Sequence, residues 1–204
     1  MRYLSLTLAL FFVILVSPVS TQTPDLNVTV NALPQTAAEF SALRDSIGNT
    51  PQGGVALLIM ALRLYQSNPT EGTPCMIMAV DRSLLVESNR ADSYQGFALM
   101  GYEASRNQRQ LQQHPYLPNS YIRGTSPENG YALPAGPFVF EITRNRYSGE
   151  EESGRIKLFI RSSGADSPRP VTLVRNNRGV WKAKEYSSIV VGIRAPASTT
   201  DDAL

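Results

Sequence analysis

The spacing of the apolar residues changes along the chain, and this change constrains the fold more than any other feature. Between residues 36 and 80 the apolar residues recur at helical spacing, whereas between 138 and 186 they alternate with polar residues as in half-buried strands. Helices followed by consecutive strands are typical of an α+β domain. We therefore predict N-terminal helices packed on a C-terminal four-stranded antiparallel meander, which a nuclear-transport-factor-like fold would also satisfy.

Capping residues mark the starts of three helices. Thr36, with Glu39 three positions later, forms a capping box ahead of apolar residues at helical spacing. Thr50 and Asn68 each precede a proline, which suits the first position of a helix. Residues 55–64 are apolar nearly all the way round, so the second helix is predicted to be the central, buried one.

Residues 81–136 give the least regular pattern. Apolar residues at helical spacing favour a helix over residues 93–113, which Gly96 and Gly101 weaken. Prolines and glycines then predict a long structured loop, and a loop of that length in a compact domain is uncommon without function or disorder behind it. The loop is expected to pack onto the body of the domain through its tyrosines, which are Tyr116, Tyr121 and Tyr131.

Four segments in the last third alternate as strands do, and turn residues separate them. They cover residues 138–143, 156–160, 171–173 and 180–186. In the last segment, Trp181 and Ala183 share one face while Lys182 and Lys184 share the other, which predicts that one face of the sheet lies against the helices. A shorter strand is predicted at residues 26–30.

The first twenty residues have the order of a secretory signal peptide. A positive start, Met1-Arg2, precedes an apolar run over residues 4–16, and Pro18 and small residues follow. The run is shorter than the roughly 20 residues that a membrane-spanning helix needs. We expect an exported protein of the periplasm or the extracellular space; an uncleaved N-terminal anchor is the alternative.

Length and composition limit the number of domains that the chain can form. With 42% hydrophobic and 18% charged residues, the chain is typical of a soluble globular protein. We expect a signal peptide at 1–21, a leader at 22–33, a single α+β domain at 34–194 and a flexible tail at 195–204. Positive charge is concentrated after residue 136, which suits either an acidic partner or a solvated sheet face; nucleic acid is not an expected partner.

Two residue types restrict the chemistry. His114 is the single histidine and lies in no nucleophile motif, and Cys75 is the single cysteine. One imidazole and one thiol cannot build a zinc site of several such ligands, so no metal and no cofactor is expected, and no catalytic residue is assigned. The apolar neighbours of Cys75 predict a buried, inert thiol, with a reactive or dimer-forming cysteine as the alternative.

Asp166 and Arg169 stand out in a Gly-Ala-Asp-Ser-Pro-Arg-Pro segment. An aspartate before Ser-Pro can fix a loop by bonding its own backbone. Arg169, between two prolines, lies on a stiff extended segment and would be suited to grip a ligand. The other interpretation is a rigid turn pinned by a contact between Asp166 and Arg169.

Three segments resemble a known family of exported bacterial proteins. They are residues 115–131, 163–173 and 185–194, together with Trp181. The family is catalogued as domain of unknown function 6935. The resemblance covers the chain from the second helix to Arg194, except for a stretch between Val80 and Gln113. It implies a single extracytoplasmic bacterial domain, and the family brings no activity, cofactor or catalytic residue.

The motif-rich loop and the later segments suggest one shared ligand surface. Tyrosine, asparagine, arginine and serine side chains suit the binding of a polar ligand or peptide. We expect a non-enzymatic binding domain for a polar ligand, peptide or glycan; a hydrolase using Asp166, or a structural protein without a small ligand, are the alternatives. The predicted ligand-binding residues are Tyr121, Asn129, Asp166, Arg169, Tyr186 and Ser187.

Overall fold

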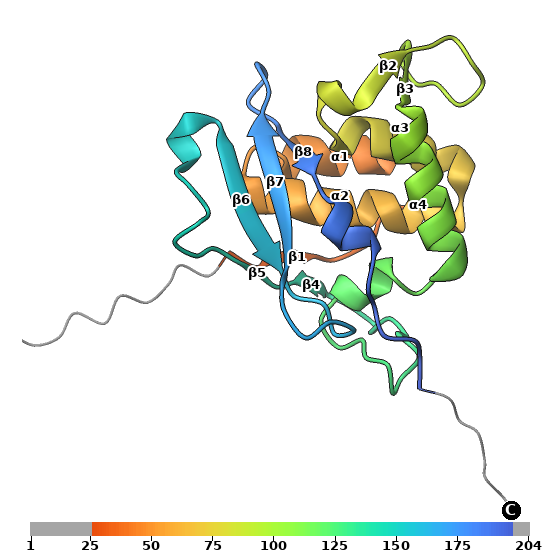
Figure 1. The fold of residues 1–204 in the computed structure, drawn as a ribbon, viewed down its shortest axis with the longest axis vertical. Coiled ribbons are helices and arrows are strands. Elements are labelled where there is room, and N and C mark those ends of the chain that lie inside the picture. Colours follow the sequence, from red (N-terminus) through yellow and green to blue (C-terminus); the bar gives the residue numbers. More distant parts are fainter. Residues whose placement is uncertain (1–25, 198–204) are drawn as a thin grey trace, which may run out of the picture.

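The computed structural model describes residues 26–197, which form two layers, helices on one face of an antiparallel sheet (Figure 1). The main sheet has the strand order β5–β6–β7–β8, with every neighbouring pair antiparallel. The predicted α+β class and the C-terminal four-stranded meander are therefore confirmed. The helices are α1 (Ala37–Ile47), α2 (Pro51–Ser67), α3 (Pro69–Ala79) and α4 (Gly101–Gln113). The meander strands are β5 (Ile142–Thr143), β6 (Arg155–Ile160), β7 (Arg169–Arg175) and β8 (Trp181–Glu185).

Shorter elements complete the description. Two strand pairs, β1 with β4 and β2 with β3, lie outside the main sheet. They are β1 (Val28–Val30), β2 (Leu85–Glu87), β3 (Phe97–Leu99) and β4 (Phe138–Phe140). The 3-10 helices are η1 (Arg82–Leu84), η2 (Pro118–Tyr121), η3 (Glu151–Ser153) and η4 (Ser187–Val190).

The expected signal peptide lies outside the described residues. So do residues 22–25 of the expected leader and residues 198–204 of the expected tail. Within residues 26–197, no helix combines the length and the apolar character that a bilayer crossing requires. The described part of the leader contains β1, as predicted for residues 26–30.

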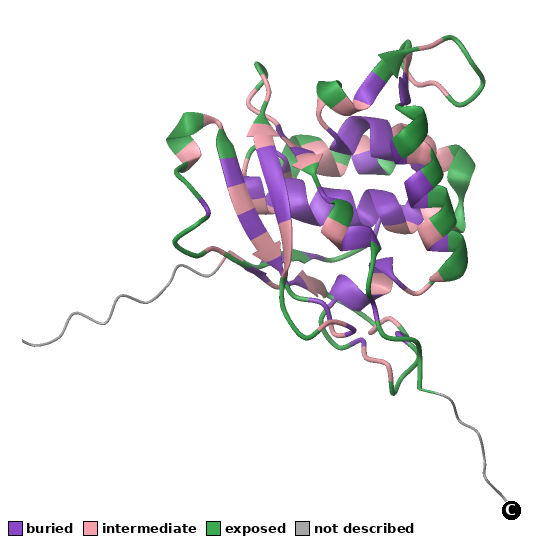
Figure 2. Ribbon diagram, in the orientation of Figure 1, coloured by how far each residue is buried: buried purple, intermediate pink, exposed green. Residues whose placement is uncertain are grey.

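Helix α2 is the centre of the molecule. Its N-cap Thr50 accepts a hydrogen bond from Gly53 N at 3.1 Å, as the sequence predicted. Residues 53–62 are all buried, between the sheet and the other helices (Figure 2). A Cβ at Gly54 would lie 2.8 Å from the Leu173 side chain and 2.9 Å from Trp181 O. Glycine is therefore needed where α2 crosses β7 and β8.

The free edge of β8 is covered by helix ends rather than by another strand. Trp181 N donates to Gly48 O and Asp81 N donates to Ala183 O, both at 2.8 Å. These bonds satisfy backbone groups that an exposed sheet edge leaves open. They also fix the C-terminal ends of α1 and α3 against the sheet.

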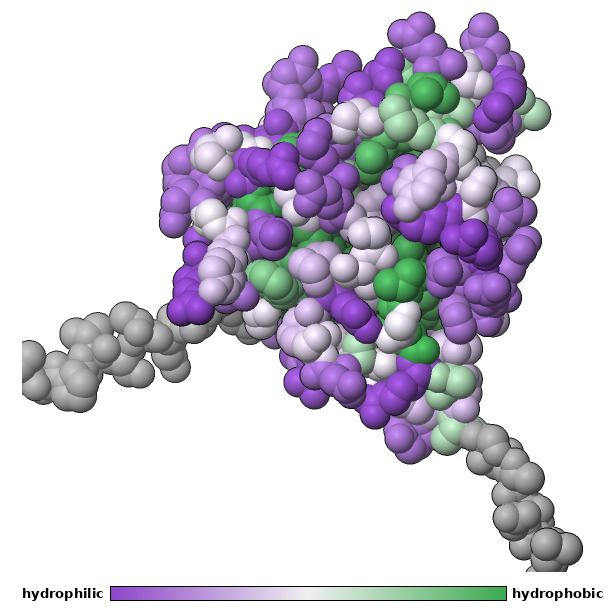
Figure 3. Space-filling model, in the orientation of Figure 1, coloured by the Kyte–Doolittle hydropathy of each residue, from purple (hydrophilic) through white to green (hydrophobic). Residues whose placement is uncertain are grey.

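The helix predicted over residues 93–113 is half wrong. Residues 97–99 form β3 of a hairpin with β2, and α4 begins only at Gly101. Gln95 and Gly96 adopt positive φ angles of 51° and 81°, which turn the chain and exclude a helix there. Phe97 lies before the start of α4, so its helical spacing from the later apolar residues was coincidental. Apolar atoms reach the surface over this hairpin (Figure 3), where Val86 is partly exposed.

The strand predicted over residues 138–143 is divided at Glu141. Residues before it form β4, which pairs with β1, and residues after it form β5, which pairs with β6. The uninterrupted alternation of apolar residues hides this change of partner. Glu141 consequently lies where the two sheets meet.

Cys75 is buried within α3, as predicted. Its Sγ donates to Glu71 O at 3.1 Å. Burial raises the pKa of the thiol to about 12, so the thiolate that would react is suppressed at neutral pH.

Candidate functional site

A polar groove opens where the loop after η2 meets the junction of β4 and β5 and the end of β6, near the lower end of the sheet in Figure 1. Its volume is about 520 Å³. We call it the polar groove and define it by the residues that line it. These are residues 120–125, Glu141, Arg161 and Ser163.

Backbone hydrogen bonds join the three segments that form this groove. Arg123 N donates to Val139 O at 2.9 Å, and Arg161 N donates to Glu141 O at the same distance. Ser163 N donates to Ser120 O at 2.8 Å. These bonds therefore fix the backbone segments that carry the charged side chains of the groove.

Two arginines share one carboxylate across the groove. Arg123 Nε lies 3.0 Å from Glu141 Oε1, and Arg161 Nε lies 3.6 Å from Glu141 Oε2. The side chains of Arg123, Arg161 and Glu141 are 51%, 73% and 33% exposed. The three groups together carry one net positive charge, and water reaches all of them.

Hydroxyl groups form the inner wall of the groove. Ser120 Oγ donates to Leu117 O at 2.7 Å and accepts from Ser162 Oγ at 2.9 Å. Ser163 Oγ donates to Ser120 O at 3.1 Å and lies 3.1 Å from Thr125 Oγ1. Ser120, Ser162 and Thr125 are buried, so this wall is ordered by the protein itself.

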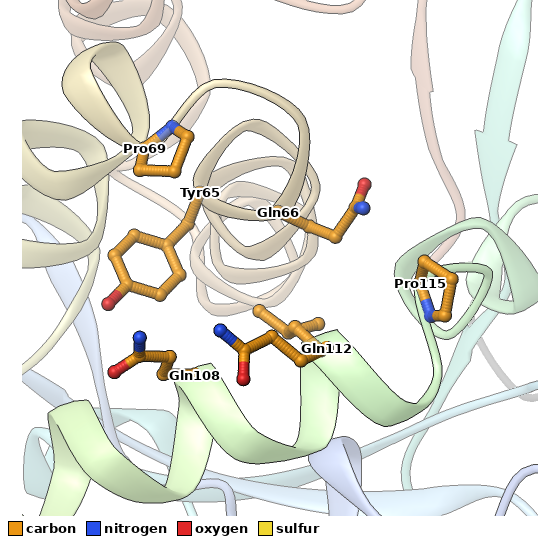
Figure 4. A pocket seen from close by; sticks show the side chains of 7 residues that line it. Tyr65, Gln66, Pro69, Gln108, Gln112 and Pro115 are labelled. Atoms are coloured by element: carbon orange, nitrogen blue, oxygen red, sulfur yellow. The ribbon is translucent and has the colours of Figure 1, made fainter.

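A second groove of about 330 Å³ lies between the C-terminal end of α2 and α4 (Figure 4). Gln108 and Gln112 of α4 face Tyr65 of α2 across it, and Pro115 closes one end. We call it the glutamine groove. Among residues 26–197, no charged side chain lines it, so within that range it offers no anchor comparable to the arginines of the polar groove. The polar groove is therefore the candidate site.

Among the six predicted site residues, Tyr121 lines the polar groove and the other five do not. Its ring is buried and its hydroxyl donates to Ile189 O at 2.7 Å. Tyr121 therefore forms a fixed part of the groove wall. Burial raises the pKa of Tyr121 well above its ordinary value. Whether any of the six contacts a ligand stays a prediction.

Asp166 and Arg169 do not contact each other as the rigid-turn interpretation required. Asp166 is 97% exposed and pairs with Arg194, at 3.7 Å between Oδ1 and Nη2. Arg169 instead donates from Nη2 to Gly192 O at 2.8 Å. The turn is fixed by bonds to the C-terminal segment, which the local sequence does not indicate.

Asn129 supports the polar groove from behind. Its Nδ2 donates to Gly124 O at 2.9 Å, and its Oδ1 accepts from Ser126 N at 2.8 Å. Gly124 has a φ of 91°, a conformation that glycine adopts without strain. Asn129 thus holds the turn that carries Arg123 and Gly124, although it is exposed and lies outside the groove.

Tyr186 belongs to a buried polar cluster between α4 and η4. Asn107 Nδ2 donates to its hydroxyl at 3.0 Å, and the Arg106 guanidinium lies 4.8 Å from its ring centroid. Arg106 is paired with Glu103 one turn earlier. Burial raises the pKa of Tyr186 well above its ordinary value. Ser187, the next residue, is exposed.

Sequence reasoning missed the arginine pair and Glu141. Arg123 lies inside the motif-rich loop, which was the available indication. Glu141 occupies a position that alternation assigns to the solvent face of a strand, and Arg161 directly follows the strand predicted over residues 156–160. Nothing local distinguishes either residue from other surface charges. His114 packs in the loop, with Nδ1 3.1 Å from the Tyr116 hydroxyl. Among residues 26–197, no group of three or more histidine, cysteine or acidic side chains is placed to hold a metal ion.

The family comparison is consistent with the sequence motifs. A family model described as "Domain of unknown function (DUF6935)" matches residues 32–197. The chain belongs to the DUF6935 family. The match includes β2, β3 and α4, so the family extends through residues 81–113, where the motifs alone had shown no resemblance. No curated protein and no solved structure matches this DUF6935 chain.

Proposed function

We propose that this DUF6935 protein is an exported bacterial envelope protein that binds a polar ligand, of peptide or glycan type, in the polar groove without transforming it. The observation that carries the proposal is the combination of two partly exposed arginines with a fixed wall of hydroxyl groups in one groove of about 520 Å³. A volume of this size lies within the range of ligand-binding clefts.

The hydroxyl groups favour binding over hydrolysis. A serine nucleophile needs a neighbouring base that accepts its proton. Here Ser120 Oγ donates to Leu117 O and Ser163 Oγ donates to Ser120 O, so both protons are held by carbonyl oxygens. Asp166, the acid considered for a hydrolase, is 97% exposed and lies outside the groove, so it is not placed to act on a ligand bound there.

A ligand screen on the purified protein tests the binding proposal. Peptides of two to five residues and soluble glycan fragments are added singly, and the melting temperature is recorded. A ligand of the groove raises the melting temperature of the native protein and not that of Arg123→Gln or Arg161→Gln. Arg178→Gln, at an exposed arginine of the β7–β8 turn, is the matched control and keeps the effect.

A ligand that still stabilises both groove variants would show that the binding site lies outside the polar groove. If no compound stabilises the native protein, a structural protein without a small ligand is favoured.

Export is tested separately. The full chain is expressed in a bacterium, and the cell is fractionated into cytoplasm, membrane, periplasm and medium. We expect the protein in the periplasm or the medium, with a mass lower by about the first 21 residues. An intact chain retained in the membrane fraction would support the uncleaved anchor instead, and an intact cytoplasmic chain would contradict export.

A further inference from the structure

We infer that the polar groove recognises a ligand through a single carboxylate, which binds between Arg123 and Arg161. This inference rests on the proposed binding function and adds the chemical class of the ligand. It is carried by three observations: the charge of the groove, the nitrogen atoms left open on the arginines, and the hydroxyl wall beside them.

The net charge of the groove suits a monoanion. Arg123 and Arg161 contribute two positive charges and Glu141 one negative charge, and Glu141 is held in place by both guanidinium groups. A carboxylate with one negative charge neutralises this set. A phosphate monoester carries nearly two negative charges at neutral pH, so it would leave excess negative charge close to Glu141.

The terminal nitrogens of both arginines remain available to a ligand. Glu141 contacts both guanidinium groups at Nε. Among residues 26–197, the terminal nitrogens of Arg123 and Arg161 make no hydrogen bond to another residue, and both side chains are more than half exposed. A guanidinium group binds a carboxylate through two parallel N–H donors, so each arginine keeps donors for a second carboxylate.

The hydroxyl wall provides for the rest of the ligand. Thr125 Oγ1 and Ser163 Oγ lie 3.1 Å apart and keep acceptor capacity after their own donated bonds. An amide N–H or a sugar hydroxyl next to the carboxylate would be able to donate to them. Two sources offer this combination: the C-terminal end of a peptide and a uronic acid.

Nitrogen-15 NMR titration of the purified protein distinguishes these possibilities. The acidic probes are N-acetyl-dialanine and galacturonate, and their neutral counterparts are N-acetyl-dialanine amide and galactose. We expect an acidic probe to shift the backbone resonances of residues 123–125 and 161–163. We expect its neutral counterpart to bind about tenfold more weakly, as the loss of one charge-assisted hydrogen bond implies. The acid that binds more tightly identifies the source.

Glu141→Gln gives a test that a folding defect cannot imitate. The change raises the net charge of the groove from one to two positive charges, so inorganic phosphate should bind more tightly to the variant than to the native protein. Arg178→Gln is the control and should leave the affinities for phosphate and for the acidic probes unchanged.

These experiments distinguish a failure of the carboxylate inference from a failure of the proposed binding site. If the neutral counterparts bind at the groove as tightly as the acids, or if phosphate binds the native protein more tightly than either acid, the carboxylate inference is wrong while the binding function stands. If no probe shifts the groove resonances, both the inference and the assignment of the polar groove as the binding site are wrong.

Discussion

The helix–sheet interface and the polar groove are built in opposite ways. At the interface, α2 approaches β7 and β8 so closely that Gly54 has no room for a Cβ, and buried Trp181 and Leu173 fill the remaining space. In the groove, two arginines and a glutamate lie partly exposed on loops and strand ends. The interface is expected to determine stability and the groove to determine recognition, so changes in the two regions should have different consequences.

Trp181→Ala should give the largest loss of stability. It removes a buried indole from the contact between β8 and α2, and removing such a ring costs about 3–5 kcal/mol of unfolding free energy. Urea denaturation monitored by circular dichroism measures this loss. Trp181→Phe is the control and should cost less, because it keeps most of the ring and Nε1 of the indole has no hydrogen-bond partner among the described residues. Equal losses for the two variants would contradict the packing explanation.

Glu103→Ala should cost about 3 kcal/mol, since it leaves the guanidinium of Arg106 buried without its carboxylate. The same denaturation measurement applies. Replacing both residues by methionine removes the pair together and should restore most of the stability. If the double variant is no more stable than Glu103→Ala, the loss comes from the helix rather than from the unpaired charge.

Lys182 should make stability depend on pH. It lies on β8 and donates from Nζ to Met78 O, and burial, with Arg44 nearby, lowers its pKa to about 8. Between about pH 8 and the pKa of an unfolded lysine, the unfolded chain binds more protons, so the contribution of Lys182 to stability rises with pH. Its size is about 2 kcal/mol.

The difference in unfolding free energy between the native protein and Lys182→Met isolates this contribution, because the opposing titrations of Cys75, Tyr121 and Tyr186 occur in both. That difference should move in favour of the native protein from pH 8 to pH 10. A difference that stays constant over this range would show that Lys182 keeps an ordinary pKa in the folded state.

Ser120→Ala should have a smaller effect, about 1–2 kcal/mol, because it leaves the buried Ser162 hydroxyl without the oxygen that accepts its proton, whereas Leu117 O keeps its bond from the backbone N–H of residue 120. Ser187→Ala removes a hydroxyl from an exposed position and should cost nothing measurable. If Ser120→Ala also leaves the melting temperature unchanged, the wall is not ordered by this hydroxyl network.

Arg161→Gln should have little effect on stability, below about 0.5 kcal/mol, because its ion pair with Glu141 is exposed and solvated. Its effect on ligand binding should nevertheless be among the largest. Denaturation and ligand titration on the same preparation check both statements. A stability loss as large as that of Trp181→Ala would make Arg161 a structural residue and remove the contrast between the two regions.

The sequence was sufficient for the interface because the information there is local. Capping residues such as Thr50, and the alternation of Trp181 with Lys182, are read within a few positions. The hairpin of β2 and β3 was missed because positive φ angles at Gln95 and Gly96 do not disturb the apolar spacing. The division of the strand at Glu141 was missed because β4 and β5 differ only in their partners, which are distant along the chain.

The candidate site was harder to predict from the sequence for the same reason. Its loop was identified, and Tyr121 with it, but Arg123, Glu141 and Arg161 come from three separate segments. Each looks like a solvated surface charge until the backbone bonds between these segments are known. Asp166 and Arg169 are close along the chain, yet each bonds to the C-terminal segment instead of to the other.

A crystal structure of the protein soaked with the acidic probe that binds more tightly shows whether a carboxylate binds between Arg123 and Arg161. We expect density for the probe in the polar groove, with its carboxylate oxygens at hydrogen-bonding distance, about 2.7–2.9 Å, from terminal nitrogens of Arg123 and Arg161. Density for the probe in the glutamine groove or elsewhere, with the polar groove empty, would contradict it.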